Sequence, residues 1–158
     1  MPNYCSNRIL ISGKDLLEFK KTLESKDDKL LFSFSQTIPC PEDEEENWYN
    51  WNINNWGTKW DISENVYIND NTFSIQCDTA WSPPIEWAKN CLKKYDLNIE
   101  IGYCEMGCQF YGYWNNKDGE NTMEFEEGDL EYDEDEEEFI LGGNLKKHVE
   151  KYEIGLGG

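Results

Sequence analysis

The chain has 158 residues, the usual size of one domain, and carries 33 acidic against 14 basic residues for a net charge of −19. Aromatic residues make up 15% of it, so it can bury a large aromatic core although its mean hydropathy is −0.82. The charge disfavours direct binding to duplex DNA or to an anionic membrane, and no apolar run reaches the roughly 18 residues of a membrane-spanning helix.

The first part of the chain predicts a strand, a helix and a second strand. The apolar run NRILIS at residues 7–12 is typical of a strand. Ser12 and Asp15 then have the spacing of a helix capping box, and residues 16–23 carry one apolar helical stripe. Residues 29–36 alternate between apolar and polar side chains, which predicts a half-buried strand.

Residues 38–62 show neither a helical nor a strand period. They contain Pro39, Pro41, an acidic run and four Trp, and we interpret them as an insertion between core elements. Residues 66–68 predict a further short strand.

The next segment predicts a second helix between two strands. Residues 72–78 and 97–103 alternate as strands do. Ser82 is a good N-cap and Pro83 suits the first helical position, so the helix is expected to begin there. An aromatic strand is expected at 108–114, followed by an Asp118–Gly119 hairpin turn and a returning strand at 122–125.

The order β-α-β, insertion, β-α-β and hairpin matches the ferredoxin-like split βαβ pattern. We therefore expect an α+β fold, an antiparallel sheet with two helices on one face, carrying a Trp-rich insertion and an acidic C-terminal extension. The domain would span residues 1–125 with its insertion at 38–62. Residues 126–158 would form the extension, mobile in its acidic part, with Asn144 capping a short helix over 145–152.

The acidic residues are concentrated in two runs, at residues 42–46 and 124–138, which together hold 16 of the 33. Outside them 17 acids face the 14 bases, so the remainder is almost neutral. A basic partner is favoured, such as a protein that itself binds nucleic acid. The acids that we assign to this candidate surface are Glu42, Asp43, Glu44, Glu45, Glu46, Glu131, Asp133, Glu134, Asp135, Glu136, Glu137 and Glu138. Acid runs also serve solubility alone, and that interpretation stays open.

The residue patterns of catalysis and metal binding are absent from the sequence, so we expect no cofactor. It has no P-loop, HExxH or GxSxG motif, and its one histidine, His148, is expected to be a solvated tail residue. Cys104 and Cys108 lack a second close cysteine pair for zinc and are better explained as a turn with two small buried thiols. The acidic runs lack the spacing of a calcium loop.

The N-terminal residues MPNYCSNRILISG have neither the basic nor the apolar region of a signal peptide. We therefore expect a cytoplasmic protein whose six cysteines are reduced.

A second candidate surface combines the segment WYNWNINNWGTKWD at 48–61 with DTAWSPP at 78–84. The first brings aromatic rings and amides together, and the second leads into a helix N-terminus, which favours an anion. Either segment could instead be structural, the first as a secondary core and the second as a helix cap. The predicted pocket residues are Trp51, Asn55, Trp56, Gly57, Thr58, Lys59, Trp60, Asp61, Asp78, Thr79, Trp81 and Ser82.

MPNYCSNRILISG, NWGTKWD, DTAWSPP and the glycine and aromatic strand at 107–114 resemble the YubB-type ferredoxin-like domain family of phages and conjugative plasmids. The resemblance covers most of residues 1–114 and implies a ferredoxin-like fold, but it implies no catalytic role for any residue. The acidic segment after Phe125 departs from the pattern expected of that family.

Three functions follow as hypotheses. The first is a non-catalytic protein of a mobile element that inhibits a host defence or nucleic-acid-binding protein, such as a nuclease, by covering its basic surface. The second is a binder of a small ligand such as a nucleotide signal, which would stack on the Trp rings. The third is an enzyme using Asp61, Asp78 and Lys59 as an acid–base set, which nothing in their spacing requires.

Overall fold

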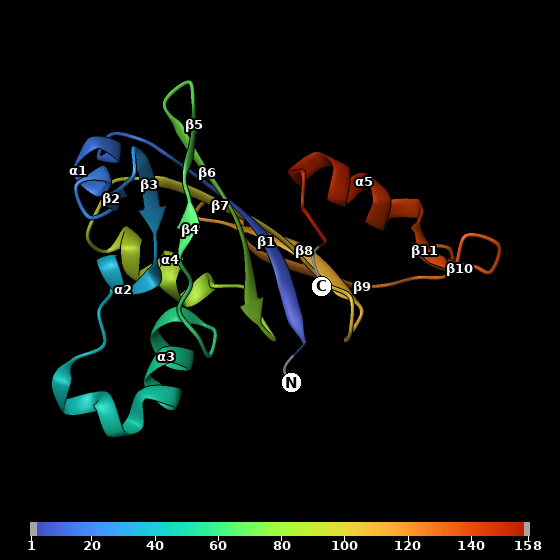
Figure 1. Cartoon of the computed structure of the whole chain (residues 1–158), viewed down its shortest axis with the longest axis horizontal. Coiled ribbons are helices and arrows are strands. Elements are labelled where there is room, and N and C mark those ends of the chain that lie inside the picture. Colours follow the sequence, from blue (N-terminus) through green and yellow to red (C-terminus); the bar gives the residue numbers. More distant parts are fainter. Residues whose placement is uncertain (1–2, 157–158) are drawn as a thin grey trace.

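The centre of the computed structural model, which describes residues 3–156, is a six-stranded antiparallel sheet (Figure 1). The strand order is β5-β6-β1-β7-β8-β9. These strands are β1 (Tyr4–Ser12), β5 (Tyr67–Asn69), β6 (Thr72–Ala80), β7 (Asn98–Glu105), β8 (Phe110–Asn115) and β9 (Gly119–Glu124). β1 lies between β6 and β7, which helix α4 (Ile85–Leu92) connects. The expected α+β class and antiparallel sheet are confirmed.

One face of the sheet is covered by α4 and the short helix α1 (Leu16–Lys20), which enclose an aromatic core. Alternate residues of β1, such as Ile9 and Ile11, point into this core and are fully buried. The Trp87 ring of α4 meets Phe32 edge-on, with centroids 4.9 Å apart. Burying such large rings supplies the apolar area that the low mean hydropathy conceals.

The predicted strand at 29–36 ends earlier than expected, and it lies outside the central sheet. Strand β3 (Lys29–Phe32) stops at Phe32 because a short helix, α2 (Phe34–Thr37), follows. Gln36 Oε1 accepts a hydrogen bond from the Ser33 N–H at 3.1 Å, which starts that helix. β3 pairs with β2 (Glu24–Lys26) and β4 (Glu64–Asn65) in a separate small sheet, while β5 forms the edge of the central sheet.

The insertion contains helices where the sequence predicts no regular structure. A 3₁₀ helix, η1 (Glu42–Asn47), leads into α3 (Trp48–Trp56), which packs beside α4. Gly57 ends α3 with φ 86°, a left-handed conformation that favours glycine. Its N–H donates to the carbonyls of Asn52 and Ile53 at 3.2 and 3.1 Å.

The second helix of the core begins later than expected. The predicted N-cap Ser82 lies outside α4, whose first residue is Ile85 and whose cap position is Pro84. The preceding strand β6 correspondingly continues to Ala80 instead of ending at Asp78. The Ser82 hydroxyl donates a hydrogen bond to Gly57 of the insertion instead of accepting one from α4. Helix α4 therefore has no side-chain cap.

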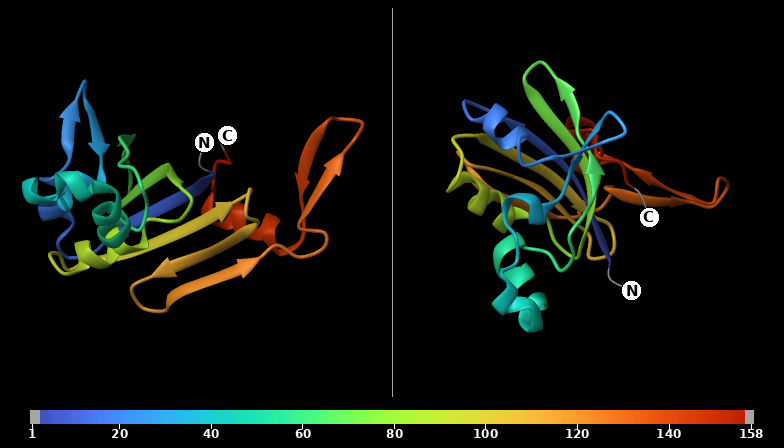
Figure 2. Two further views of the ribbon diagram at one scale, coloured as in Figure 1. Left: turned by 90° about the horizontal axis from the view of Figure 1, so that it is seen from below. Right: turned by 60° about the vertical axis from the view of Figure 1, so that its left-hand side comes forward.

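The segment after β9 forms a projecting hairpin and then a helix, and the helix covers the opposite face of the sheet. The hairpin pairs β10 (Leu130–Asp133) with β11 (Glu138–Leu141) and projects from the sheet (Figure 2). Helix α5 (Gly143–Tyr152) confirms the predicted tail helix, but Gly142, not Asn144, occupies its cap position. α5 packs on β7 and β8, so helices lie on both faces of the sheet.

Helix α5 is held on the sheet by Tyr152. The Tyr152 ring lies directly on Gly102 of β7, a position where any Cβ would overlap the ring. The Tyr152 hydroxyl donates to Glu100 Oε1 at 2.6 Å. Arg8 Nη2 donates to the Glu153 carbonyl at 2.7 Å and satisfies the end of the helix. No helix formed by residues 3–156 has the length and apolar character needed to cross a lipid bilayer.

Candidate functional site

The two segments of the predicted pocket lie in direct contact. The Ser82 hydroxyl donates to the Gly57 carbonyl at 2.5 Å, and the Thr58 hydroxyl donates to the Ala80 carbonyl at 3.0 Å. Gly57 also lies so close to the first residues of α4 that an added Cβ would be 3.1 Å from the Pro83 carbonyl oxygen. These contacts join the Trp-rich insertion to the start of α4.

Several predicted pocket residues are built into the core. Trp56 is buried and donates from Nε1 to the Ile38 carbonyl at 2.9 Å. Thr58 and Thr79 are buried, and Asn55 accepts a hydrogen bond at its carbonyl from Asn90. At this junction the structural interpretation of the insertion, a secondary core, agrees with the contacts.

The predicted pocket residues Trp51 and Trp81 differ in burial. Trp51 is half-buried and meets the Trp56 ring edge-on, with centroids 5.6 Å apart. Trp81 is exposed, and its φ of 72° is a left-handed conformation that is unusual for a large side chain. Trp51 therefore packs against the main core, whereas Trp81 lies on the surface.

The outward side of the insertion is aromatic. Trp48, Tyr49 and Trp60 are exposed. The Lys59 Nζ lies 4.8 Å from the centroid of the Trp60 ring and 5.2 Å from that of Tyr49. The ammonium group is therefore held against two ring faces by the attraction of a cation to aromatic electrons.

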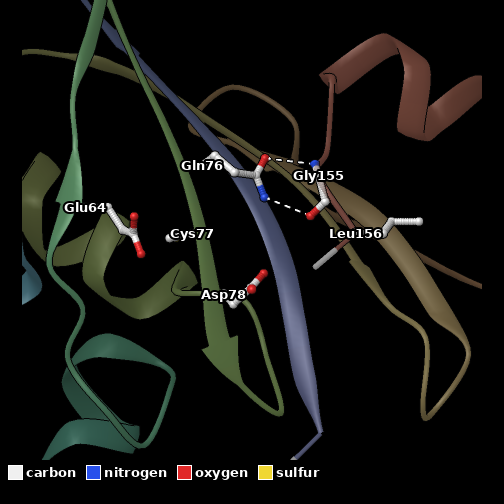
Figure 3. Close-up of a pocket in the computed structure, with 6 residues that line it drawn as sticks. All are labelled: Glu64, Gln76, Cys77, Asp78, Gly155 and Leu156. Atoms are coloured by element: carbon white, nitrogen blue, oxygen red, sulfur yellow. Dashed lines mark hydrogen bonds between the residues drawn. The ribbon is translucent and has the colours of Figure 1, made fainter. Parts of the chain in front are cut away.

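The two aspartates proposed for catalysis have different partners. Asp61 Oδ1 accepts the Phe34 N–H at 2.7 Å and the Ile62 N–H at 2.8 Å, so it caps α2. Asp78 lines a hollow of about 400 Å³ with Glu64 (Figure 3). Within the described part of the chain, no hydrogen bond or ion pair unites Asp61, Asp78 and Lys59 as one catalytic set.

The hollow beside Asp78 is an acidic depression covered on one side by the C-terminal segment. Burial raises the pKa of the Asp78 carboxyl, and burial together with the Asp78 charge raises that of Glu64. The Gln76 side-chain amide makes two hydrogen bonds with the Gly155 backbone: its Oε1 accepts the N–H at 3.1 Å, and its Nε2 donates to the carbonyl at 3.2 Å (Figure 3). Within residues 3–156 no group of three or more His, Cys, Asp or Glu side chains could hold a metal ion.

The first acidic run forms helix η1, none of whose residues is buried. It leads directly into exposed Trp48 and Tyr49. Among the residues that the structure describes, no lysine or arginine forms an ion pair with these acids. The run is therefore an uncompensated anionic surface next to exposed rings.

The second acidic run continues into the β10–β11 hairpin, whose two faces differ chemically. Tyr132 pairs with Phe139 and Glu131 pairs with Ile140. Because successive side chains of a strand point to opposite faces, Tyr132 and Phe139 share one face with Leu130 and Leu141. The other face carries Glu131, Asp133, Glu138 and Ile140. The sequence interpretation assigned the acids of this hairpin but missed its aromatic face, which the alternation of apolar and acidic residues at 130–133 signals.

Asp129 and Asp133 shape this segment. Asp129 is buried, and its carboxylate accepts the N–H groups of Glu126 and Leu145 at 2.8 and 3.4 Å. Asp133 Oδ1 accepts the Asp135 N–H at 2.9 Å within the turn. The remaining acids of the hairpin are exposed.

The expectation that His148 is solvated is wrong. His148 is buried between Tyr111 and Tyr152, and its Nε2 lies 3.0 Å from the Tyr103 carbonyl oxygen. Burial lowers the pKa of the imidazole. The helical spacing of Leu145, His148 and Tyr152, all on the buried side of α5, could have revealed it.

The expectation that Cys104 and Cys108 are both buried is confirmed for Cys104 and wrong for Cys108. Cys104 is buried, and burial raises its pKa to about 12, so it is a poor nucleophile. Cys108 is exposed, in a turn where the buried Glu105 carboxylate accepts the N–H groups of Gly107 and Cys108 at 2.5 and 3.0 Å.

These features define an α+β protein with an antiparallel six-stranded sheet, a buried Trp and Phe cluster, and two exposed acidic elements that adjoin aromatic side chains. Residues 55–142 match the family model described as the ferredoxin-like domain in Api92-like protein, and the chain belongs to this family. The match includes the β10–β11 hairpin, which lies in the segment after Phe125 that the sequence analysis expected to depart from the YubB-type pattern. No curated protein and no solved structure matches the chain.

Proposed function

We propose that this protein is a non-catalytic binding protein that covers a basic surface of another protein. The observation that carries the proposal is the form of the two acidic runs. Each forms an exposed element next to exposed aromatic side chains: η1 beside Trp48 and Tyr49, and the β10–β11 hairpin with Tyr132 and Phe139. Solubility requires only the charge, whereas the combination of charge and exposed rings is typical of interaction surfaces.

The negative electrostatic field around these two acidic elements favours a basic partner. The two runs hold most of the excess negative charge, while the rest of the chain is almost neutral. A partner rich in Lys and Arg would be attracted over a distance of about 10 Å at moderate salt, and its association would be accelerated. Such surfaces occur on proteins that bind nucleic acid through its phosphates, so a nucleic-acid-binding protein is the partner class we propose.

The resemblance to the YubB-type domains of phages and conjugative plasmids extends this proposal. In a mobile element, the partner would be a host defence or nucleic-acid-processing protein, which the acidic elements would inhibit by excluding its nucleic acid. The protein would then act by occupancy, with no chemistry of its own.

The test uses matched variants, because residues 42–46 and 134–138 have the same sequence, EDEEE. In one variant both segments are changed to QNQQQ, which removes ten carboxylates and retains side-chain size. Host proteins captured by the unchanged chain but not by this variant are purified, and binding is measured directly at rising salt. We expect binding to weaken about tenfold or more between low and high salt, because exposed charges are screened.

Two results would overturn the proposal. One is a purified partner that binds the unchanged chain and the QNQQQ variant equally. The other is a complex whose affinity does not respond to salt. A matched loss of nucleic acid binding by the partner would establish the inhibitory form of the proposal.

The small-ligand hypothesis has narrower support. Its best observation is Lys59, which lies between the exposed rings of Tyr49 and Trp60 and could meet an anionic group. Against it, Trp56, Thr58 and Thr79 are buried in contacts within the protein. Titration with a nucleotide panel, followed by intrinsic Trp fluorescence, tests it directly: a saturable response that Trp60→Ala removes would favour this function.

A further inference from the structure

The β10–β11 hairpin exposes the aromatic end of its apolar face, whereas Leu141 at the other end packs against the cluster that holds α5 on the sheet. Tyr132 is 55% exposed and Phe139 is 62% exposed, with their ring centroids 5.2 Å apart. The hairpin stands away from the central sheet in both views (Figure 2). Neighbouring apolar side chains that stay exposed, rimmed by polar residues, are typical of a binding surface.

The charge of the hairpin limits what that partner can be. Residues 131–138 contain seven carboxylates, and the chain has no Lys or Arg between Lys117 and Lys146. A second copy of the chain would bring two sets of these carboxylates together, and like charges at a contact are repulsive. A nucleic acid or an anionic lipid surface is disfavoured for the same reason. Charge complementarity therefore selects a basic surface.

The apolar face adds a second requirement. A purely polybasic segment would satisfy the carboxylates but leave the Tyr132 and Phe139 rings in water. We propose that the apolar face of the β10–β11 hairpin binds an apolar groove or stripe flanked by Lys and Arg on the partner protein. This inference rests on the proposed function, and it assigns the binding of the basic partner to the β10–β11 hairpin and not to η1.

The two parts of the hairpin have separable roles. Aromatic side chains at the centre of an interface carry much of the affinity, whereas surrounding charges mainly govern the association rate and the salt dependence. The rings should therefore decide how tightly an amphipathic basic partner binds, and they should matter little for a polybasic one.

The experiment compares two labelled peptides with equal numbers of lysines. One has an apolar leucine stripe flanked by lysines, and the other has serine in place of every leucine. Fluorescence anisotropy measures the binding of each to the full chain and to Tyr132→Ser/Phe139→Ser. The control is Tyr67→Ser, because Tyr67 on β5 is also 62% exposed.

We expect the double variant to bind the leucine peptide about tenfold more weakly than the unchanged chain and to bind the serine peptide equally well. The control should bind both peptides as the unchanged chain does. Equal loss in the Tyr67 control, or no loss in the double variant, overturns the inference. The thermal unfolding midpoint checks that each variant is folded, and Phe139→Leu, which keeps the face apolar, should retain most of the affinity.

Separate QNQQQ variants at 42–46 and 134–138 distinguish failure of this inference from failure of the proposed function. Each removes five carboxylates from the same pentapeptide. If only the 42–46 variant binds the leucine peptide more weakly, acidic binding stands and the hairpin assignment is wrong. If neither variant binds more weakly, both the inference and the proposed function fail. A selective loss in the 134–138 variant supports both.

Discussion

The contact between Gly102 and Tyr152 gives a quantitative test of how α5 is held. In Gly102→Ala the new Cβ would lie 2.5 and 2.7 Å from Cδ1 and Cδ2 of the Tyr152 ring, far inside normal carbon contact. The ring cannot easily move away, because its hydroxyl is bonded to Glu100 and its face stacks on Tyr113. Overpacking of this kind destabilises a protein by about 1–3 kcal/mol.

The effect should reverse when the ring is absent. In a Tyr152→Ala background the Cβ introduced at position 102 meets open space, and alanine restricts the unfolded chain more than glycine does. Gly102→Ala should then be neutral or stabilising by about 0.4–1 kcal/mol. The coupling free energy between the two positions should therefore be about 1–4 kcal/mol.

The assay is urea unfolding of the four proteins of this double-mutant cycle, followed by far-UV circular dichroism. For a chain of this size, Gly102→Ala alone should also lower the thermal midpoint by about 2–4 °C per kcal/mol. Additive free energies across the cycle would refute the reasoning, because they would show that the methyl group introduced at position 102 and the Tyr152 ring do not compete for one space.

Three further outcomes are expected. Asp61→Ala should lower the free energy of unfolding by about 1–2 kcal/mol in urea, because the N–H of Phe34 loses its acceptor; unchanged stability would contradict the capping role. Gly57→Ala should be destabilising by about 1–2 kcal/mol or more from the left-handed φ alone, with added strain against the Pro83 carbonyl, whereas a neutral effect would show that the junction can shift. Burial lowers the pKa of His148, so the unfolded chain takes up the proton first and stability should fall as pH drops from about 7 through the usual value near 6.5. His148→Gln should lack that component when urea midpoints of both proteins are compared across this pH range, and parallel pH profiles would disprove it.

How much the sequence predicts differs between the core and the insertion. Strict alternation in β6 and β7 located both strands, because a strand with one buried face must alternate. Residues 30–35 also alternate, apart from Leu31, yet the chain turns into α2 after Phe32. There the capping contacts of Gln36 and Asp61 outweigh the periodicity, and Asp61 lies too far along the chain for local patterns to reveal it.

The candidate surfaces show the same division. The sequence located the two acidic runs and the segments around Gly57 and Ser82, since composition and unusual residue clusters are visible without a structure. It could not show that the Ser82 hydroxyl donates a hydrogen bond to the Gly57 carbonyl and so joins the two segments. It also could not show that Tyr132 and Phe139 stay exposed, because exposure depends on what the rest of the chain covers.

The sequence by itself determined the acidic character of this protein, its aromatic core and its α+β class, because charge, ring content and periodicity are local properties. Only the tertiary structure decided where those properties act. Packing buried Trp56 of the insertion, which local pattern could not separate from its exposed neighbours, and it turned α5 onto the second face of the sheet over Gly102. The same packing covered Leu141 at the base of the β10–β11 hairpin and left the Tyr132 and Phe139 rings exposed.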